Sequence, residues 1–338
     1  APELIAALGG DDKVAAEALL FLRPLLSCTV FTYLILLLAA ILRGVGNSQL
    51  AFRVALLQNG LNILFNLVLI TGRFGVPALG VQGAAYGTAA SQAIAVAVFL
   101  GVLTRGAVPG VHFRPRLVRI DLELARHLWK IGAPAALDMV ILNASFISLV
   151  AMLGRLDDHA VAAHGIGLRI QALAFVPGMS IAQATTALVG QALGAKKPDE
   201  AIAVHRASVR LCVAVMGTLS AIVFVFAPWI VQVFDVSPDS AVGQYTVTWM
   251  RILGVGMPIV AAWIATTGLL QGAGDTASSL RINTIATLAV QIPVSWLLGF
   301  PLGLGCLGVW LGLPIAGAFR TIQGALYVRT GKWQTKRA

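Results

Sequence analysis

Long apolar stretches separated by short polar connections make up almost the whole chain. Such a stretch predicts a membrane-spanning helix, because about 20 apolar residues cross the hydrocarbon core of a bilayer. A helix is the expected form since it satisfies its backbone hydrogen bonds within its own segment. Nine such stretches run near residues 18–42, 52–71, 81–104, 129–153, 164–190, 206–234, 246–271, 280–300 and 304–328. The pattern therefore predicts an all-α integral membrane protein with nine transmembrane helices.

The chain also carries an internal repeat. The segment AILRGVGNS, which ends at Ser48, returns as GLLQGAGDT, which ends at Thr276. The segment GVQGAAYG from Gly80 returns as GCLGVWLG from Gly305. Residues 1–104 and about 227–328 are therefore predicted to be two copies of one unit. Roughly 100 residues of apolar sequence precede the second copy and none precede the first, so we expect three opening helices to be missing from the first half.

Composition and charge placement support the membrane interpretation. Hydrophobic residues make up 58% of the chain and charged residues 11%, against about 25% charged residues in soluble domains. The net charge of +10 does not indicate nucleic-acid binding, because the cations gather in alternate connections. One set of connections and the C-terminal tail hold 17 of the 24 Lys and Arg residues, and the opposite set holds 3. Since positive loops stay in the cytoplasm, the C-terminus is predicted to be cytoplasmic.

One carboxylate stands out among the acidic residues. Of 14 acidic residues, only Asp138 falls well inside an apolar stretch, where a charge costs about 2.5–3.5 kcal/mol on insertion scales. The functional interpretation is a group that binds H⁺ or a cation and faces a cavity. The structural interpretation is a carboxylate that is hydrogen-bonded to a neighbouring helix or wetted near the cytoplasmic end. Ser145 shares its helix face, whereas Asn143 lies elsewhere on the helix.

Buried amides form a second group of candidates. Asn59, Asn62 and Asn66 follow one face of the helix predicted over 52–71. Thr287 and Gln291 stand in the matching helix of the second copy, and Gln92 and Gln171 are further isolated amides. These residues predict either hydrogen bonds between helices, worth about 0.6 kcal/mol each, or the lining of a substrate cavity.

Glycines at four-residue spacing predict close contacts between helices. Gly83 and Gly87 form one such pair, and Gly308 and Gly312 form its counterpart in the second copy. The histidines and cysteines show no metal-ligand spacing, so no metal and no cofactor are expected.

Several segments resemble the multidrug and toxic compound extrusion (MATE) family, and details are similar to its bacterial DinF-like branch. They are RGVGNSQLAFR with LNILFN, GVPALGVQGAAYGTAAS, WKIGAPAALD, AAHGIGLRI, PGMSIAQATTALVGQALGA and GLLQGAGDT, in the order of the family. The resemblance implies a twelve-helix fold of two six-helix lobes. It divides the chain into half of an N-terminal lobe (1–104), a cytoplasmic linker (105–128), a C-terminal lobe (129–328) and a cytoplasmic basic tail (329–338).

The resemblance also implies a function. Members expel drugs and organic cations in exchange for H⁺ or Na⁺, and Asp138 stands where they often have Glu or Asp, which implies an ion-coupling role. A structural role falls to the glycines and the acid of the shared motifs: Gly44, Gly46, Gly83, Gly87, Gly272, Gly274, Asp275, Gly308 and Gly312. The expected location is the bacterial inner membrane, and the expected partners are lipid and a small-molecule substrate. Neither a nucleic-acid partner nor an oligomer is expected.

Two alternatives remain at this point. A flippase for a lipid-linked sugar or lipid would share the architecture but should line its cavity with cations, and the helices predicted over 52–71, 81–104, 129–153 and 280–300 have no internal Lys or Arg. A membrane enzyme would need clustered carboxylates to hold Mg²⁺. The acidic pairs at 11–12 and 157–158 lack a third acid nearby.

Overall fold

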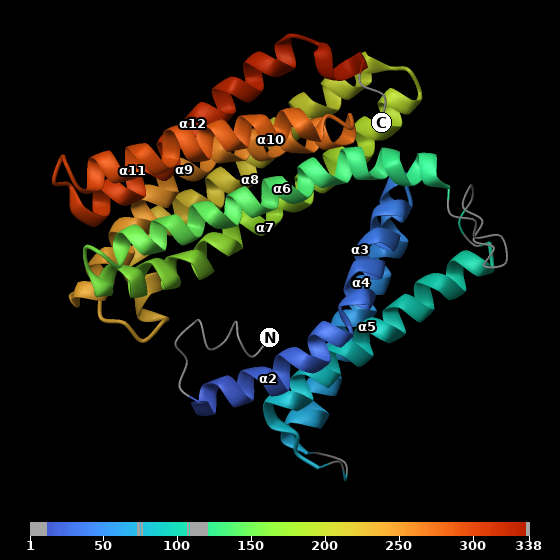
Figure 1. Ribbon diagram of the computed structural model, residues 1–338, viewed down its shortest axis with the longest axis horizontal. Coiled ribbons are helices and arrows are strands. Elements are labelled where there is room, and N and C mark those ends of the chain that lie inside the picture. The colour runs from blue at the N-terminus through green and yellow to red at the C-terminus, as the bar shows by residue number, and fades with distance from the viewer. Residues whose placement is uncertain (1–11, 73–74, 76, 107, 109–120, 336–338) are drawn as a thin grey trace. The chain divides into compact units, whose positions relative to one another are not determined.

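The computed structural model describes residues 12–72, 75, 77–106, 108 and 121–335, and these residues are almost entirely helical (Figure 1). The chain divides into two compact units, residues 1–119 and 120–338. Within the described residues, eight helices are long and apolar enough to cross a membrane, or nine if one bent pair counts as a single span. The all-α membrane fold predicted from the apolar stretches is confirmed.

The first unit contains four helices, namely α2 (Asp12–Ser27), α3 (Thr29–Gly44), α4 (Ser48–Thr71) and α5 (Gly80–Thr104). The helix predicted over 18–42 is interrupted, because α2 and α3 meet at a bend of 49° and together make one candidate span. Pro24 lacks the N–H that would continue the helical ladder. The hydroxyls of Ser27 and Thr29 bond back to the carbonyls of Arg23 and Leu25, an arrangement that bends helices.

Helices α4 and α5 pack closely because glycines remove side chains between them. A Cβ at Gly83 would lie 2.6 Å from the carbonyl oxygen of Leu69, and one at Gly87 would collide with Asn66. The close contact predicted for this glycine pair is confirmed. The same holds in the second copy, where a Cβ at Gly308 would lie 2.5 Å from the backbone of Leu298.

The second unit is built around one central helix. Its elements are α6 (Leu122–Leu153), α7 (Asp158–Gly194), α8 (Pro198–Gln232), α9 (Ala241–Gly272), α10 (Thr276–Thr284), the π-helix η3 (Ile285–Gln291), α11 (Ile292–Gly299), α12 (Gly305–Arg329) and the short η4 (Lys332–Thr335). Helix α9 packs against α7, α8 and α12, while α10 lies along α6 (Figure 1). The main core of this unit gathers around the buried indoles of Trp249 and Trp310.

The helix predicted over 280–300 is not a regular α-helix. It runs as α10, η3 and α11, which together make one candidate span from Thr276 to Gly299. The π-helix in its middle carries Thr287 and Gln291. Such π segments are frequent at functional sites, and both side chains are buried here.

The repeated turn has the same backbone in both copies. Gly46 has φ 84° and Gly274 has φ 72°, a left-handed conformation that glycine adopts without strain. The residue that follows each glycine, Asn47 or Asp275, makes a different hydrogen bond in the two copies. Asn47 accepts a hydrogen bond from the backbone of Leu50 and caps α4, whereas Asp275 accepts a bond from the hydroxyl of Tyr327 at 2.5 Å.

Several helices extend beyond the apolar stretches because polar residues cap them. Helix α6 begins at Leu122 with Asp121 as its N-cap, so the predicted linker over 105–128 is too long at its C-terminal end. Residues 107 and 109–120 of that linker lie outside the described residues. The start of the predicted tail over 329–338 packs on the second unit, because the side chain of Trp333 is fully buried.

Candidate functional site

Asp138 lies on α6 with its side chain directed at α10. It is 9% exposed. The Ser279 hydroxyl donates a hydrogen bond to its Oδ2 at 3.2 Å, and the Asn283 amide donates one to its Oδ1 at 2.7 Å. A buried carboxylate is tolerated when such donors satisfy its oxygens. Both donors stand four residues apart on α10, which places them on one face.

A second tie holds α10 against α6 near this carboxylate. The Thr276 hydroxyl donates to the backbone carbonyl of Ile131 at 2.6 Å. Pro134 follows three residues later inside α6 and cannot donate to the preceding turn of the helix. The start of α10 is therefore fixed to α6 about two turns before Asp138.

A buried cation faces the same region from α12. Arg320 is 8% exposed, and its Nη2 donates to Thr287 Oγ1 at 2.8 Å and to Gln291 Oε1 at 3.2 Å. The Gln291 amide in turn donates to the Ser145 hydroxyl. The network therefore runs from α12 through the π-helix back to α6, the helix that carries Asp138.

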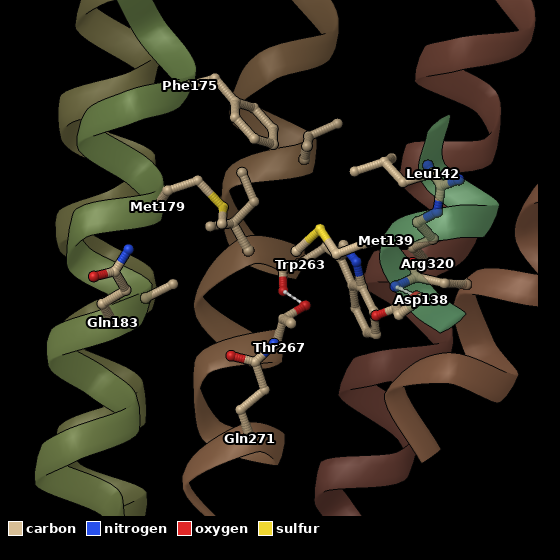
Figure 2. A pocket seen from close by; sticks show the side chains of 14 residues that line it. Asp138, Met139, Leu142, Phe175, Met179, Gln183, Trp263, Thr267, Gln271 and Arg320 are labelled. Carbon is tan, nitrogen blue, oxygen red and sulfur yellow. Dashed lines mark hydrogen bonds between the residues drawn. The ribbon is translucent and has the colours of Figure 1, made fainter. Parts of the chain in front are cut away.

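Asp138 and Arg320 line one cavity of about 190 Å³ in the second unit. Figure 2 shows both charged side chains on one side, with Phe175, Met179 and Gln183 of α7 across from them. Helix α9 supplies the wall between these sides. Its lining residues are Val260, Trp263, Ile264, Thr267 and Gln271. The cavity thus combines one carboxylate, one guanidinium and several amides with aromatic and thioether surface.

The two charges act on one another across the cavity without a direct ion pair. The salt bridges found among the described residues do not include one between Asp138 and Arg320, but opposite charges that line one cavity attract each other across it. Among the residues that the structure describes, Asp138 and Arg320 are the charged ones that line this cavity. With both ionised the cavity has no net charge, and uptake of a proton or cation by Asp138 makes it positive.

Of the four amides predicted on the first unit, two bond to a neighbouring helix and two donate within their own helix. Asn62 donates to the hydroxyl of Thr88 on α5 at 3.1 Å, and Asn66 donates to the side-chain oxygen of Asn62 at 3.2 Å. Asn59 is exposed and donates to a carbonyl of its own helix. Gln92 accepts a bond from Thr32 on α3 at 3.0 Å. The contacts of Asn62 and Gln92 fit the interhelical interpretation, and a role of these amides in a substrate cavity stays a prediction.

The remaining predicted residues have different places in the second unit. Thr287 and Gln291 hold Arg320, as described, and are buried. Gln171 lines a smaller cavity of about 80 Å³, which Arg320 also lines. Gly272 and Gly312 lie at close helix contacts, whereas Gly44 has open space around it.

Arg320 is the important residue that the sequence reasoning missed. It stands inside the apolar stretch 304–328, on the last predicted helix, and an ionisable residue in such a position indicates a function by default. That signal was present in the sequence. What no spacing revealed is that this residue and Asp138, 182 positions apart, line the same cavity.

Comparisons with known proteins find relatives that match most of the chain. The MatE family model matches residues 1–68 and 134–297. The probable multidrug resistance protein NorM of Thermotoga maritima is 26% identical over 328 residues, which cover 96% of this chain and 69% of that protein. The probable multidrug resistance protein YoeA of Bacillus subtilis is 26% identical over 94% of this chain and 68% of its own length.

Solved structures show the same fold. A MOP superfamily transporter from Pyrococcus furiosus superposes with a TM-score of 0.91 at 24% identity, over 100% of this chain and 74% of that chain. A MATE crystal structure in the straight conformation superposes with a TM-score of 0.88 at 24% identity, over 98% of this chain and 72% of that chain.

Proposed function

Because this chain belongs to the MatE (MATE) family of multi-pass membrane transporters, we propose that it exports drugs and organic cations in exchange for inward H⁺ or Na⁺. Members of this family are transporters and not enzymes, so the membrane-enzyme alternative is set aside. The names of the multidrug resistance relatives support drugs as the cargo.

The observation that carries the proposal is Asp138 in the wall of the cavity of the second unit. Its two hydrogen-bond donors and the nearby guanidinium stabilise the ionised form, while burial among apolar side chains opposes it. A carboxylate balanced in this way can exchange a proton or hold Na⁺. A cationic drug and the coupling ion would then compete for the same charge, which is the requirement for antiport.

The proposed transport cycle needs alternating access. In secondary transporters, one half of the molecule moves against the other around a shared site. We assign this role to the two units of the chain, with the connections rich in Lys and Arg, and the C-terminus, in the cytoplasm. The flippase alternative is disfavoured because a flippase should line its cavity with several cations to hold a diphosphate, and Arg320 is the one cation among the described residues that line this cavity.

The test is a charge-removing substitution in the natural gene product, expressed in bacteria that lack their own drug exporters. Asp138→Asn keeps the shape of the side chain and removes its charge, so we expect export of ethidium to slow by about tenfold or more, the effect of losing one ion interaction of about 1.4 kcal/mol. Accumulation of the dye is followed over a range of pH and Na⁺ concentration.

Asp121→Asn is the matched control. It removes the same charge from the same helix, outside the cavity, and Asn caps a helix as well as Asp does. This variant should export ethidium like the wild type. Transport by Asp138→Asn at the wild-type rate under every condition would refute the coupling role. Failure of the well-expressed wild type to protect cells from any drug would refute the export function itself.

A further inference from the structure

Arg320 has hydrogen-bonding capacity that its protein neighbours do not use. The side chain is more than nine-tenths buried, and its Nε has no hydrogen-bond partner, while Nη2 bonds to Thr287 and Gln291. A buried guanidinium group in a membrane helix is costly and marks a functional position by default. Its two neighbours on the π-helix hold the group in place, so its direction is set by the fold.

Asp138 does not neutralise this guanidinium by direct contact. Both carboxylate oxygens of Asp138 accept bonds from α10 side chains, and no direct ion pair joins the two residues. The carboxylate of Asp138 therefore already accepts two hydrogen bonds, whereas the guanidinium of Arg320 has a donor, Nε, without an acceptor. An organic anion is the ligand that would use that N–H, because guanidinium groups bind carboxylates and sulfonates through charge-assisted hydrogen bonds.

Arg320 also stands between two cavities. It lines the cavity of about 190 Å³ that contains Asp138 and the cavity of about 80 Å³ that contains Gln171. The Oε1 atom of Gln171 is likewise buried without a partner. Phe175 borders both cavities, and Met179 and Trp263 add apolar surface to the larger one. Drug-sized ligands occupy pockets of at least about 300 Å³, so these cavities would accept one end of such a molecule.

We propose that Arg320 binds the acidic group of amphiphilic organic anions, whose aromatic body lies against Phe175, Met179 and Trp263. This inference rests on the proposed function in one respect, namely that the cavity with Asp138 is where cargo binds. It extends the cargo beyond organic cations, with Asp138 and Arg320 serving opposite charges in a single cavity.

The two charges make the cavity respond in opposite ways to the two kinds of cargo. An anion at Arg320 is repelled by ionised Asp138, whereas a cation at Asp138 is repelled by Arg320. Among the described lining residues, Asp138 and Arg320 are the charged groups that face this cavity from α6 and α12, and those of α7, α9 and α10 are uncharged. Removing either charge should therefore weaken one ligand and strengthen the other.

A matched pair of ligands tests this prediction directly. Naphthalene-2-sulfonate and (2-naphthylmethyl)trimethylammonium share an aromatic body and differ in the sign of their charge. Their binding to the purified natural gene product in lipid nanodiscs is measured by isothermal titration calorimetry. We expect Arg320→Gln to weaken the sulfonate by about tenfold or more while the ammonium compound binds at least as tightly as before. We expect Asp138→Asn to strengthen the sulfonate and weaken the ammonium compound.

The ammonium compound also reports on folding, because a misfolded Arg320→Gln protein would lose both ligands. If that variant does not fold, the effect of Asp138→Asn on the sulfonate tests the proposal with Arg320 intact. Arg320→Lys retains the charge without the planar fork and should keep part of the sulfonate affinity. The proposal is overturned if the wild type does not bind the sulfonate, if Arg320→Gln binds it unchanged, or if Asp138→Asn fails to strengthen it. Failure of ethidium export with sulfonate binding intact would refute only the proposed function.

Discussion

Two neighbouring glycines on α7 allow the packing of the second unit to be tested with an internal control. A Cβ at Gly167 would collide with Cδ1 and Nε1 of the Trp249 indole, whereas a Cβ at Gly165 would meet no atom within 4 Å. The indole cannot move aside easily. It is fully buried, and its ring centroid lies 5.0 Å from that of His164 and 5.6 Å from that of Trp310.

The expected magnitude follows from comparing the two alanine variants. Overpacking a core by one methyl group costs about 1–3 kcal/mol. Replacing glycine by alanine inside a helix contributes about 0.5–1 kcal/mol in the opposite direction. Because Gly165→Ala and Gly167→Ala share this second effect, the difference between their free energies of unfolding isolates the collision with Trp249. We expect Gly167→Ala to be less stable than Gly165→Ala by about 1–3 kcal/mol.

The measurement is unfolding of the purified natural gene product in mixed micelles with increasing dodecyl sulfate, followed by tryptophan fluorescence. Gly165→Ala should unfold at or above the wild-type midpoint and Gly167→Ala clearly below it. Equal midpoints for the two variants would show that the indole of Trp249 relaxes without cost and would refute the tight core inferred around it.

Three further predictions concern other parts of the chain. The Tyr245 hydroxyl donates to Asp157 at 2.9 Å and lowers the pKa of that carboxyl from its ordinary value of 3.8. The stability difference between wild type and Tyr245→Phe should therefore be full at neutral pH and disappear as the pH falls below about 4; a difference that persists in acid would contradict this. Gly308→Ala places a methyl 2.5 Å from the backbone of α11 and should lower the unfolding midpoint more than an alanine at Gly165, by the same dodecyl sulfate assay. Reporter fusions after Lys197 should lie in the cytoplasm and those after Asp157 outside, since positive loops stay inside; the reverse would overturn the topology.

The sequence by itself predicted the membrane class and most of the helices. This was possible because the hydrocarbon core requires long apolar segments with internally satisfied backbones. It also identified the glycine pairs at helix contacts, since a four-residue spacing puts both members on one face. Asp138 was recognisable because a carboxylate in an apolar stretch costs free energy in the membrane, and such residues therefore usually have a partner or a functional role.

The tertiary structure decided what surrounds that carboxylate. Ser279, Asn283 and Arg320 come from helices far along the chain, and no periodicity within one helix specifies which faces of different helices meet. The π-helix that positions Thr287 and Gln291 was also hidden, because its hydrogen-bond pattern differs from that of an α-helix without leaving a distinct apolar period. The bend between α2 and α3 was not predicted either. It accompanies hydrogen bonds from hydroxyl groups to backbone carbonyls, and the pattern of apolar residues gives no sign of such bonds. The sequence thus located one charge of the site, and only packing brought the opposite charge into the same cavity.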